Sequence, residues 1–343
     1  MMGWMHDLRL SLPLVVALAA AACAAPVTDD STTTMVPAAV STTTATPTAT
    51  TTNASPSTRA ADLPTARTEV AGAVWDGRIV VLGGLDGGGA TSAAVEIYDP
   101  TTDSWSQGPD LPEPLHHTAV AVLDDRLYVL GGYGARTAQW TPRSDVWSLG
   151  PGESEWTTEP PMRTARGAHA AVTAGNTIMV IGGVGEGGGI LTTTELFVTG
   201  SGWTDGPDLA VGREHLAAAV DGAGLVYAIA GRAGGLGSNH DSVEVYDGSA
   251  WAMAPSLQHA RGGIGAATLD GRPCVAGGEE EIGTIGSVEC LVDGAWVVAG
   301  RLDTPRHGLV VVALDGVLHV IGGGPRPALT VSTVHEVVPI TPD

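Results

Sequence analysis

The sequence predicts an all-β protein made of six four-stranded antiparallel sheets arranged around an axis. Three observations lead to this prediction. A glycine pair that ends an apolar stretch recurs about every 45 to 51 residues, a period typical of stacked or radial repeats. Each repeat contains four short segments with strand composition. Side chains are small in the first segment and large in the last, the gradient that wedge-shaped sheets around an axis require.

Residues 1–22 have the composition of an export signal. Residues 10–22 form a short apolar run, and Cys23 follows directly after Ala20-Ala21-Ala22. Such a run is too short for a stable membrane span but has the length of a signal-peptide core. The segment resembles a bacterial lipoprotein signal, although Ala20 stands where a larger aliphatic residue is usual. The resemblance implies lipidation of Cys23 and anchoring at the cell surface; ordinary cleavage nearby is the alternative.

Residues 23–62 consist mainly of Thr, Ser, Ala and Pro, with almost no charge. Such a segment has too little apolar surface to form a core. We expect it to be a disordered stalk that holds a folded body, residues 63–343, away from a membrane.

The first repeat shows how the four strands are recognised. Small and β-branched residues at 70–74 are followed by an Asp76-Gly77 hairpin turn. The next strand, 79–82, is apolar without alternation, as in a strand buried on both faces. The third covers 94–98, and the fourth begins at Trp105. A proline follows the tryptophan in several repeats, as an outer edge strand allows.

A glycine pair after the second strand, a tyrosine-like position on the third and a tryptophan on the fourth resemble the kelch repeat. The resemblance covers about residues 67–340 and implies a six-bladed kelch-type β-propeller with four-stranded antiparallel blades. Trp147, Phe197 and Leu291 are assigned to the tyrosine position. The fourth repeat is expected to keep only its first glycine, Gly231, because Arg232 follows it.

The sixth repeat lacks its tryptophan strand. The segment Ala61-Asp62-Leu63-Pro64 resembles the ends of other fourth strands, such as Pro109-Asp110-Leu111-Pro112. We therefore expect residues near 55–62 to close the ring as the outer strand of the last blade. The alternative is a last blade of three strands.

Candidate ligand-binding residues precede the innermost strands. An arginine recurs about sixteen residues before the glycine pair, and histidines lie near the same junction. Guanidinium groups around the mouth of the central shaft could bind carboxylate or phosphate. The alternative is that each arginine pairs with a recurring glutamate, such as Glu96 or Glu195. The candidates are Arg67, Arg166, Arg213, Arg261, Arg306, His116, His117 and His169.

The composition limits the partners. A net charge of −21 argues against nucleic acid, which requires a clustered basic surface. The histidines are scattered about one per repeat without close ligand spacing, so no metal and no cofactor are expected. We expect a monomer. Cys274 and Cys290 occupy second- and third-strand positions of one repeat, so we predict a disulfide in an oxidising compartment. The alternative is two buried free thiols.

Two functions remain open from the sequence. The first is a non-enzymatic, surface-anchored scaffold that binds a protein or glycan partner on a propeller face. The second follows from a resemblance to exported bacterial kelch propellers and is a sugar-acid epimerase or mutarotase. It would use an arginine at the shaft mouth for the carboxylate and a nearby Glu or His as acid–base. Fold alone does not choose between them.

Overall fold

The structure is a computed structural model that describes residues 56–135 and 140–341. The expected export signal, Cys23 and most of the expected stalk lie outside these ranges. Within them, no helix is long and apolar enough to cross a membrane. The two helical segments are short 3₁₀ turns, η1 (Glu186–Gly188) and η2 (Leu236–Ser238).

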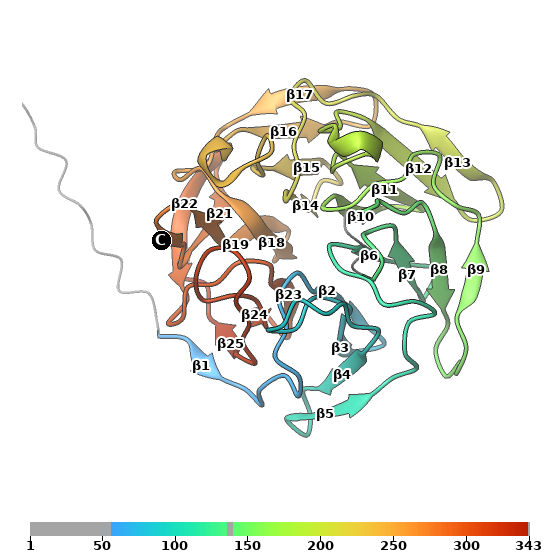
Figure 1. Ribbon diagram of the computed structural model, residues 1–343. Coiled ribbons are helices and arrows are strands. Elements are labelled where there is room, and N and C mark those ends of the chain that lie inside the picture. The colour runs from blue at the N-terminus through green and yellow to red at the C-terminus, as the bar shows by residue number, and fades with distance from the viewer. Residues whose placement is uncertain (1–55, 136–139, 342–343) are drawn as a thin grey trace, which may run out of the picture. The chain divides into compact units, whose positions relative to one another are not determined.

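The strands form six antiparallel sheets around a central axis, which confirms the predicted six-bladed propeller (Figure 1). The strands of each blade are given from the axis outward. Blade 1 contains β2 (Ala71–Trp75), β3 (Arg78–Leu82), β4 (Val95–Asp99) and β5 (Ser104–Gln107). Blade 2 contains β6 (Ala119–Leu123), β7 (Arg126–Leu130), β8 (Val146–Leu149) and β9 (Thr157–Glu159). Blade 3 contains β10 (Ala170–Ala174), β11 (Thr177–Ile181), β12 (Thr194–Val198) and β13 (Gly202–Asp205). Blade 4 contains β14 (Ala217–Val220), β15 (Val226–Ile229), β16 (Val243–Tyr246) and β17 (Trp251–Ala254). Blade 5 contains β18 (Gly262–Leu269), β19 (Arg272–Glu280), β21 (Ser287–Val292) and β22 (Ala295–Arg301). Blade 6 contains β23 (Val310–Leu314), β24 (Val317–Ile321), β25 (His335–Val338) and β1 (Thr58–Arg59).

The innermost strands carry small side chains because neighbouring blades converge there. A Cβ atom on Gly72 would lie 2.4 Å from the Val80 carbonyl oxygen and 2.9 Å from a methyl group of Val310 in blade 6. A Cβ atom on Gly265 would lie 2.6 Å from Val311. The predicted size gradient therefore has a steric cause at the axis.

The hydrophobic core is divided among the interfaces between blades. Six apolar clusters are present in the described residues, and each one joins two neighbouring blades. At the rim, tryptophan indoles join the same neighbours. The indole N–H of Trp156 donates to the carbonyl oxygen of Pro109 at 3.1 Å, and that of Trp203 donates to Pro160 at 2.8 Å.

The ring closes as predicted, with an N-terminal strand at the outside of the last blade. β1 pairs with β25, with Thr58 opposite Val337 and Arg59 opposite Glu336. Ala61 accepts the indole N–H of Trp105 at 2.8 Å, as Pro109 does for Trp156. The expected boundary between stalk and propeller at residue 62 is therefore too late, because β1 is part of the last blade.

The glycine pair ends the second strand in every blade but the fifth, where β19 continues to Glu280. The first position has φ values from 54° to 74°, and the second has values from 86° to 116°. In blade 4 these two positions are Ala230 (φ 51°) and Gly231 (φ 89°). The assignment of Gly231 as the first glycine was wrong by one residue. Alanine can adopt the first conformation, which lies in the left-handed helical region, whereas the second lies outside it and favours glycine.

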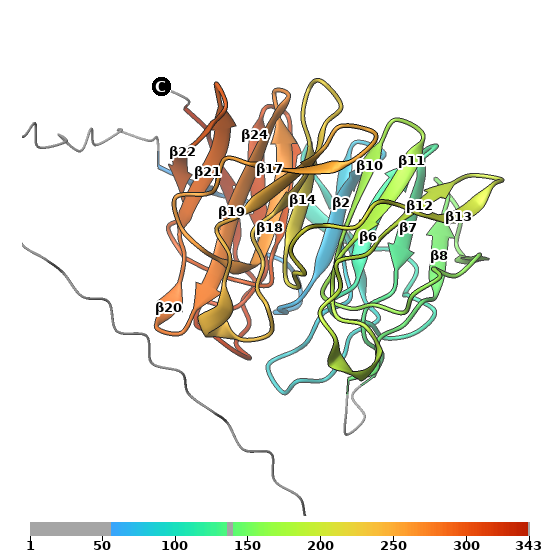
Figure 2. The same ribbon diagram turned by 90° about the horizontal axis from the view of Figure 1, so that it is seen from above.

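Cys274 and Cys290 lie directly opposite each other on β19 and β21 and are joined by a disulfide, with Cα atoms 4.1 Å apart. The same blade carries an additional short strand, β20 (Gly283–Thr284), which pairs with β19. Figure 2 shows β20 projecting from one end of the blades. This end carries the loops between second and third strands, and we call it the mouth face.

Candidate functional site

The five candidate arginines lie in the interior and anchor the connections between blades. All are 0% exposed. Arg166 shows the arrangement: Nη1 donates to Gly182 O at 2.8 Å, and Nη2 donates to Glu195 Oε1 at 2.7 Å. Glu195 also accepts the backbone N–H of Arg163 at 2.7 Å. The equivalent pairs are Arg67–Glu96, Arg213–Glu244, Arg261–Glu289 and Arg306–Glu336.

This arrangement is the glutamate pairing that the sequence left as the alternative. Each arginine ties the connection between two blades to the end of a second strand and to a third strand. Burial is the main cause that lowers the pKa of Arg306, to about 10, so its guanidinium is charged at neutral pH. None of the five has surface with which to contact a ligand in this structure.

Blade 2 replaces the ion pair with an apolar pair. Leu115 occupies the arginine position, and both it and Trp147 belong to the same apolar cluster. Trp147 pairs with Val129 and Leu149 pairs with Leu127, which places Leu149 at the tyrosine position. The assignment of Trp147 to that position was therefore wrong; it replaces the glutamate.

A ring of six equivalent residues surrounds the axis, each two positions after the buried arginine or Leu115. Their φ values are all positive, from 51° to 69°. Backbone hydrogen bonds link them in sequence: His117 N–H donates to Glu69 O at 3.2 Å, Ala168 N–H to His117 O at 3.0 Å, and His215 N–H to Ala168 O at 2.8 Å. Gly263 and Gly308 continue the ring, and Val70 N–H closes it on Gly308 O at 3.3 Å. We call these residues the axial ring: Glu69, His117, Ala168, His215, Gly263 and Gly308.

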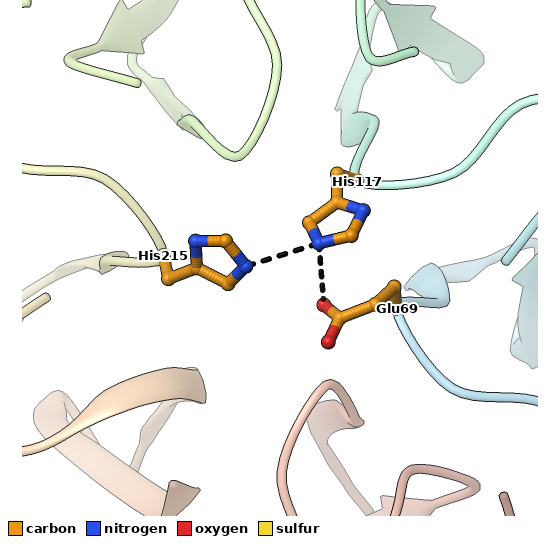
Figure 3. A group of neighbouring side chains, drawn as sticks. All are labelled: Glu69, His117 and His215. Carbon is orange, nitrogen blue, oxygen red and sulfur yellow. Dashed lines mark hydrogen bonds and ion pairs between the residues drawn. The ribbon is translucent and has the colours of Figure 1, made fainter. Parts of the chain in front are cut away.

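Three members of the axial ring carry ionisable side chains, and these meet at the axis (Figure 3). His117 Nε2 lies 3.0 Å from His215 Nε2 and 3.3 Å from Glu69 Oε2. One ligating atom from each of the three lies within 4.8 Å of the others. His117 is buried, and burial is the main cause that lowers its pKa well below the usual value. It is therefore neutral at pH 7.

Residues one position before the axial ring surround this cluster. His215 Nδ1 is hydrogen-bonded to Glu214 Oε2, and Glu214 Oε1 accepts from Arg232 Nε at 2.7 Å. Arg232 also donates from Nη1 to Glu279 Oε1 at 2.9 Å. The backbone φ of Arg232 is not positive, and its side chain points into the mouth. His116 Nδ1 contacts His117 Nδ1.

His307 lies between two carboxylates. Its Nδ1 is 3.4 Å from Glu69 Oε1 and 3.6 Å from Glu279 Oε2. Burial alone lowers the pKa of His307, but Glu69 and Glu279 raise it by more, so the net shift is upward. For Glu69 burial alone raises the pKa, and the neighbouring histidines lower it well below its usual value. Glu69 is therefore ionised at neutral pH.

The cluster lies between two cavities. A pocket of about 290 Å³ opens on the mouth face, with apolar walls that include Leu85, Trp140 and Leu329 and a polar floor that includes the cluster. A cavity of about 80 Å³ lies on the other side and is also lined by Glu69, His117 and His215. Trp140 packs edge-on against His116, with ring centroids 4.7 Å apart.

The structure separates the predicted candidates into two groups. His117 is in the axial cluster, His116 supports it, and His169 is buried beside the smaller cavity. The arginines are interior. His215 and His307, which are among the histidines expected near this junction, also lie in the site, whereas the sequence analysis missed Glu69 and Glu279. The position two residues after each recurring arginine was the signal that would have found the axial ring.

Comparisons with known proteins agree with the fold. The KLHDC2/KLHL20/DRC7 Kelch-repeats domain matches residues 38–183. Beta-scruin of Limulus polyphemus is 28% identical over 196 residues, covering 55% of this chain and 21% of that protein. Kelch-like protein 34 of Homo sapiens is 35% identical over 114 residues, 32% of this chain and 18% of that protein. The chain thus matches about a fifth of the length of these relatives.

A solved structure titled "Structure of YjhT" has the same fold, with a TM-score of 0.71 over 82% of this chain and 97% of that chain, at 16% sequence identity. The repeats in the sequence, the closure of the ring by β1 and the match to this solved structure all indicate the same fold. Residues 38–183 match a kelch-repeat domain, and the described residues fold as a six-bladed propeller.

Proposed function

We propose that the propeller is a binding scaffold that docks a protein partner on its mouth face. The observation that carries this proposal is the distribution of exposed large apolar side chains. Four are exposed in the described residues, and three of them, Trp140, Ile282 and Leu329, lie in or beside loops between second and third strands. Trp140 is 48% exposed and Ile282 is 91% exposed. Such side chains gathered on one face are typical of interaction sites.

The pocket supports a protein partner over a small ligand. Its volume of about 290 Å³ is at the lower limit of small-molecule sites. Two of the three exposed side chains, Trp140 and Leu329, form its wall. Aromatic residues around a central pocket are the usual anchors of protein interfaces. We infer that a partner inserts one side chain into the pocket and covers the surrounding loops.

The experiment is a selection of displayed peptides on the immobilised chain. Binders are then measured on Trp140→Ala and Leu329→Ala, with Met253→Ala as the control because Met253 is at least as exposed but lies on the rim strand β17. We expect each mouth variant to weaken binding by at least about 30-fold, as for an interface anchor, and the control to have no effect. Peptides that bind both mouth variants as tightly as the unchanged protein would contradict the proposal. Binding of glycans but no peptides in a parallel array would assign the face to carbohydrate.

We also propose that the protein is exported and anchored to the cell surface through a lipid on Cys23. The lipoprotein-like segment supports this, and so does the disulfide between Cys274 and Cys290, which suits an oxidising compartment. Cys23→Ala should move the protein from the membrane fraction to the soluble exported fraction. Mass spectrometry of the N-terminal peptide should show a lipid on Cys23 in the unchanged protein. An unmodified Cys23 in the mature protein would refute the anchor.

The sugar-acid epimerase hypothesis gains no support. It assigned the substrate carboxylate to an arginine among the five candidates, and all five are buried with their donors on protein acceptors. Arg232 does face the pocket, but two of its donors are held by Glu214 and Glu279.

A further inference from the structure

We propose that Glu69, His117 and His215 form a binding site for a divalent transition-metal ion, of the kind that zinc occupies, at the floor of the shaft mouth. The site goes beyond the proposed docking of a partner, since it requires no partner to form. The ligands would be Glu69 Oε2 and the two Nε2 atoms. Imidazole nitrogen and carboxylate oxygen together are the donors that zinc commonly takes.

The spacing of the three donors fits one ion. Ligands about 2.0–2.1 Å from a tetrahedral ion lie about 3.3–3.4 Å from each other. His117 Nε2 is 3.3 Å from Glu69 Oε2 and 3.0 Å from His215 Nε2. The third pair, Glu69 and His215, has ligating atoms within 4.8 Å of each other, so these two side chains would close by at most about 1.5 Å to seat the ion. Figure 3 shows the three side chains pointing to the same place from three different blades.

The surrounding groups prepare the histidines as ligands. Glu214 accepts from Nδ1 of His215, which leaves Nε2 with its lone pair directed at the site. A carboxylate behind a histidine is the usual support of a metal ligand. His117 Nδ1 faces His116 Nδ1, so a proton on His117 Nδ1 has an acceptor while Nε2 stays free. His116 Nε2 has no partner among the described residues and can carry the other proton.

The residues of the axial ring differ in side chain but share one backbone conformation. All six positions have positive φ, which favours glycine. Blades 5 and 6 have glycine there and blade 3 has Ala168, none of which carries a ligating group. Blades 1, 2 and 4 carry Glu69, His117 and His215, with φ between 51° and 53°. The three positions that carry a long side chain therefore all carry one that can ligate a metal.

The charge and access of the site also suit a cation. Three carboxylates, Glu69, Glu214 and Glu279, lie around it, with Arg232 and His307 as their neighbours. The pocket and the smaller cavity both reach the three ligands. An ion there would keep at least one coordination position for water or for a donor from a bound molecule, as open sites do.

The test uses the untagged full chain, stripped with a chelator and titrated with Co²⁺, whose visible absorption reports coordination. Zn²⁺ is then added in competition. We expect one ion per chain, a visible spectrum that Zn²⁺ removes, and an unfolding temperature that rises with Zn²⁺ concentration by mass action. No spectrum and no thermal shift would overturn the proposal and would leave the three side chains as a proton-linked network.

The variants are Glu69→Gln, His117→Asn and His215→Asn. Asparagine tolerates the left-handed backbone, so the fold should persist, which far-ultraviolet circular dichroism checks. Each should weaken Co²⁺ binding by more than 100-fold, and Glu214→Gln by about 10- to 100-fold because it only supports His215. The control is His259→Asn, since His259 is a 61% exposed histidine 3.5 Å from Glu289. Loss of binding in the control but not in the three variants would place the ion on the surface and refute the site.

Discussion

Arg166 and Glu195 show how a buried ion pair can be a fixed part of a repeat. Removing one partner leaves a charge in the interior, whereas replacing both by apolar groups of similar volume is often tolerated. Blade 2 contains such a replacement, because Leu115 and Trp147 occupy the two positions within one apolar cluster. The ion pair is therefore one of two solutions that this chain uses at the same place.

Arg166→Leu should lower the free energy of unfolding by about 3–5 kcal/mol, because Glu195 stays buried without its partner. The double variant Arg166→Leu/Glu195→Trp copies blade 2 and should recover most of this loss. Denaturant unfolding followed by tryptophan fluorescence measures both. Arg163→Leu is the surface control, since the Arg163–Asp205 pair is exposed and should contribute at most about 1 kcal/mol. An Arg166→Leu variant as stable as this control would show that the ion pair is dispensable.

At the scale of strands, the sequence predicted most of the fold because each strand carries its own signal. Apolar second strands, turns such as Asp76-Gly77 and the rim tryptophans are local features, and all are found where expected. The closure by β1 was also predictable, since residues 61–64 repeat the pattern after a fourth strand. The errors fell where local composition was ambiguous. Ala230 was missed because alanine gives no sign of a positive φ, and Trp147 because an aromatic residue fits two positions of the third strand.

The candidate site was predictable only in part because its residues come from separate blades. His117 and His215 are 98 residues apart, yet their Nε2 atoms are 3.0 Å apart. The expectation of no metal site relied on close spacing in the sequence, which applies to ligands on one loop or helix. In a radial repeat, equivalent positions converge on the axis regardless of that spacing. The arginines were selected because they recur, but a residue that recurs in five of the six blades belongs to the scaffold, whereas the axial ring differs from blade to blade.

At the scale of the whole molecule, buried histidines link stability to pH. Burial is the main cause that lowers the pKa of His335 to about 4, and its neighbour His319, whose Nδ1 is 2.9 Å from His335 Nε2, lowers it further. Asp103 raises the pKa of His335, whereas Arg306 lowers it, as His319 does. The pKa values of His116, His117 and His169 are lowered as well, whereas that of His307 is raised.

A histidine with a lowered pKa in the folded state binds fewer protons there than in the unfolded chain. Its contribution to stability is present above the unfolded pKa of about 6.5 and is lost as the pH falls toward the folded value. The raised pKa of His307 makes a contribution of opposite sign, but more histidines have lowered pKa values than raised ones. We therefore expect the free energy of unfolding to fall between pH 7.5 and pH 5, by about 2 kcal/mol for His335 alone. Denaturant unfolding of metal-free protein at the two pH values measures the change, and His335→Phe, which keeps a ring against Tyr98, should reduce it by that amount. The same pH dependence in the variant and the unchanged protein would show that His335 is not a source of the acid sensitivity.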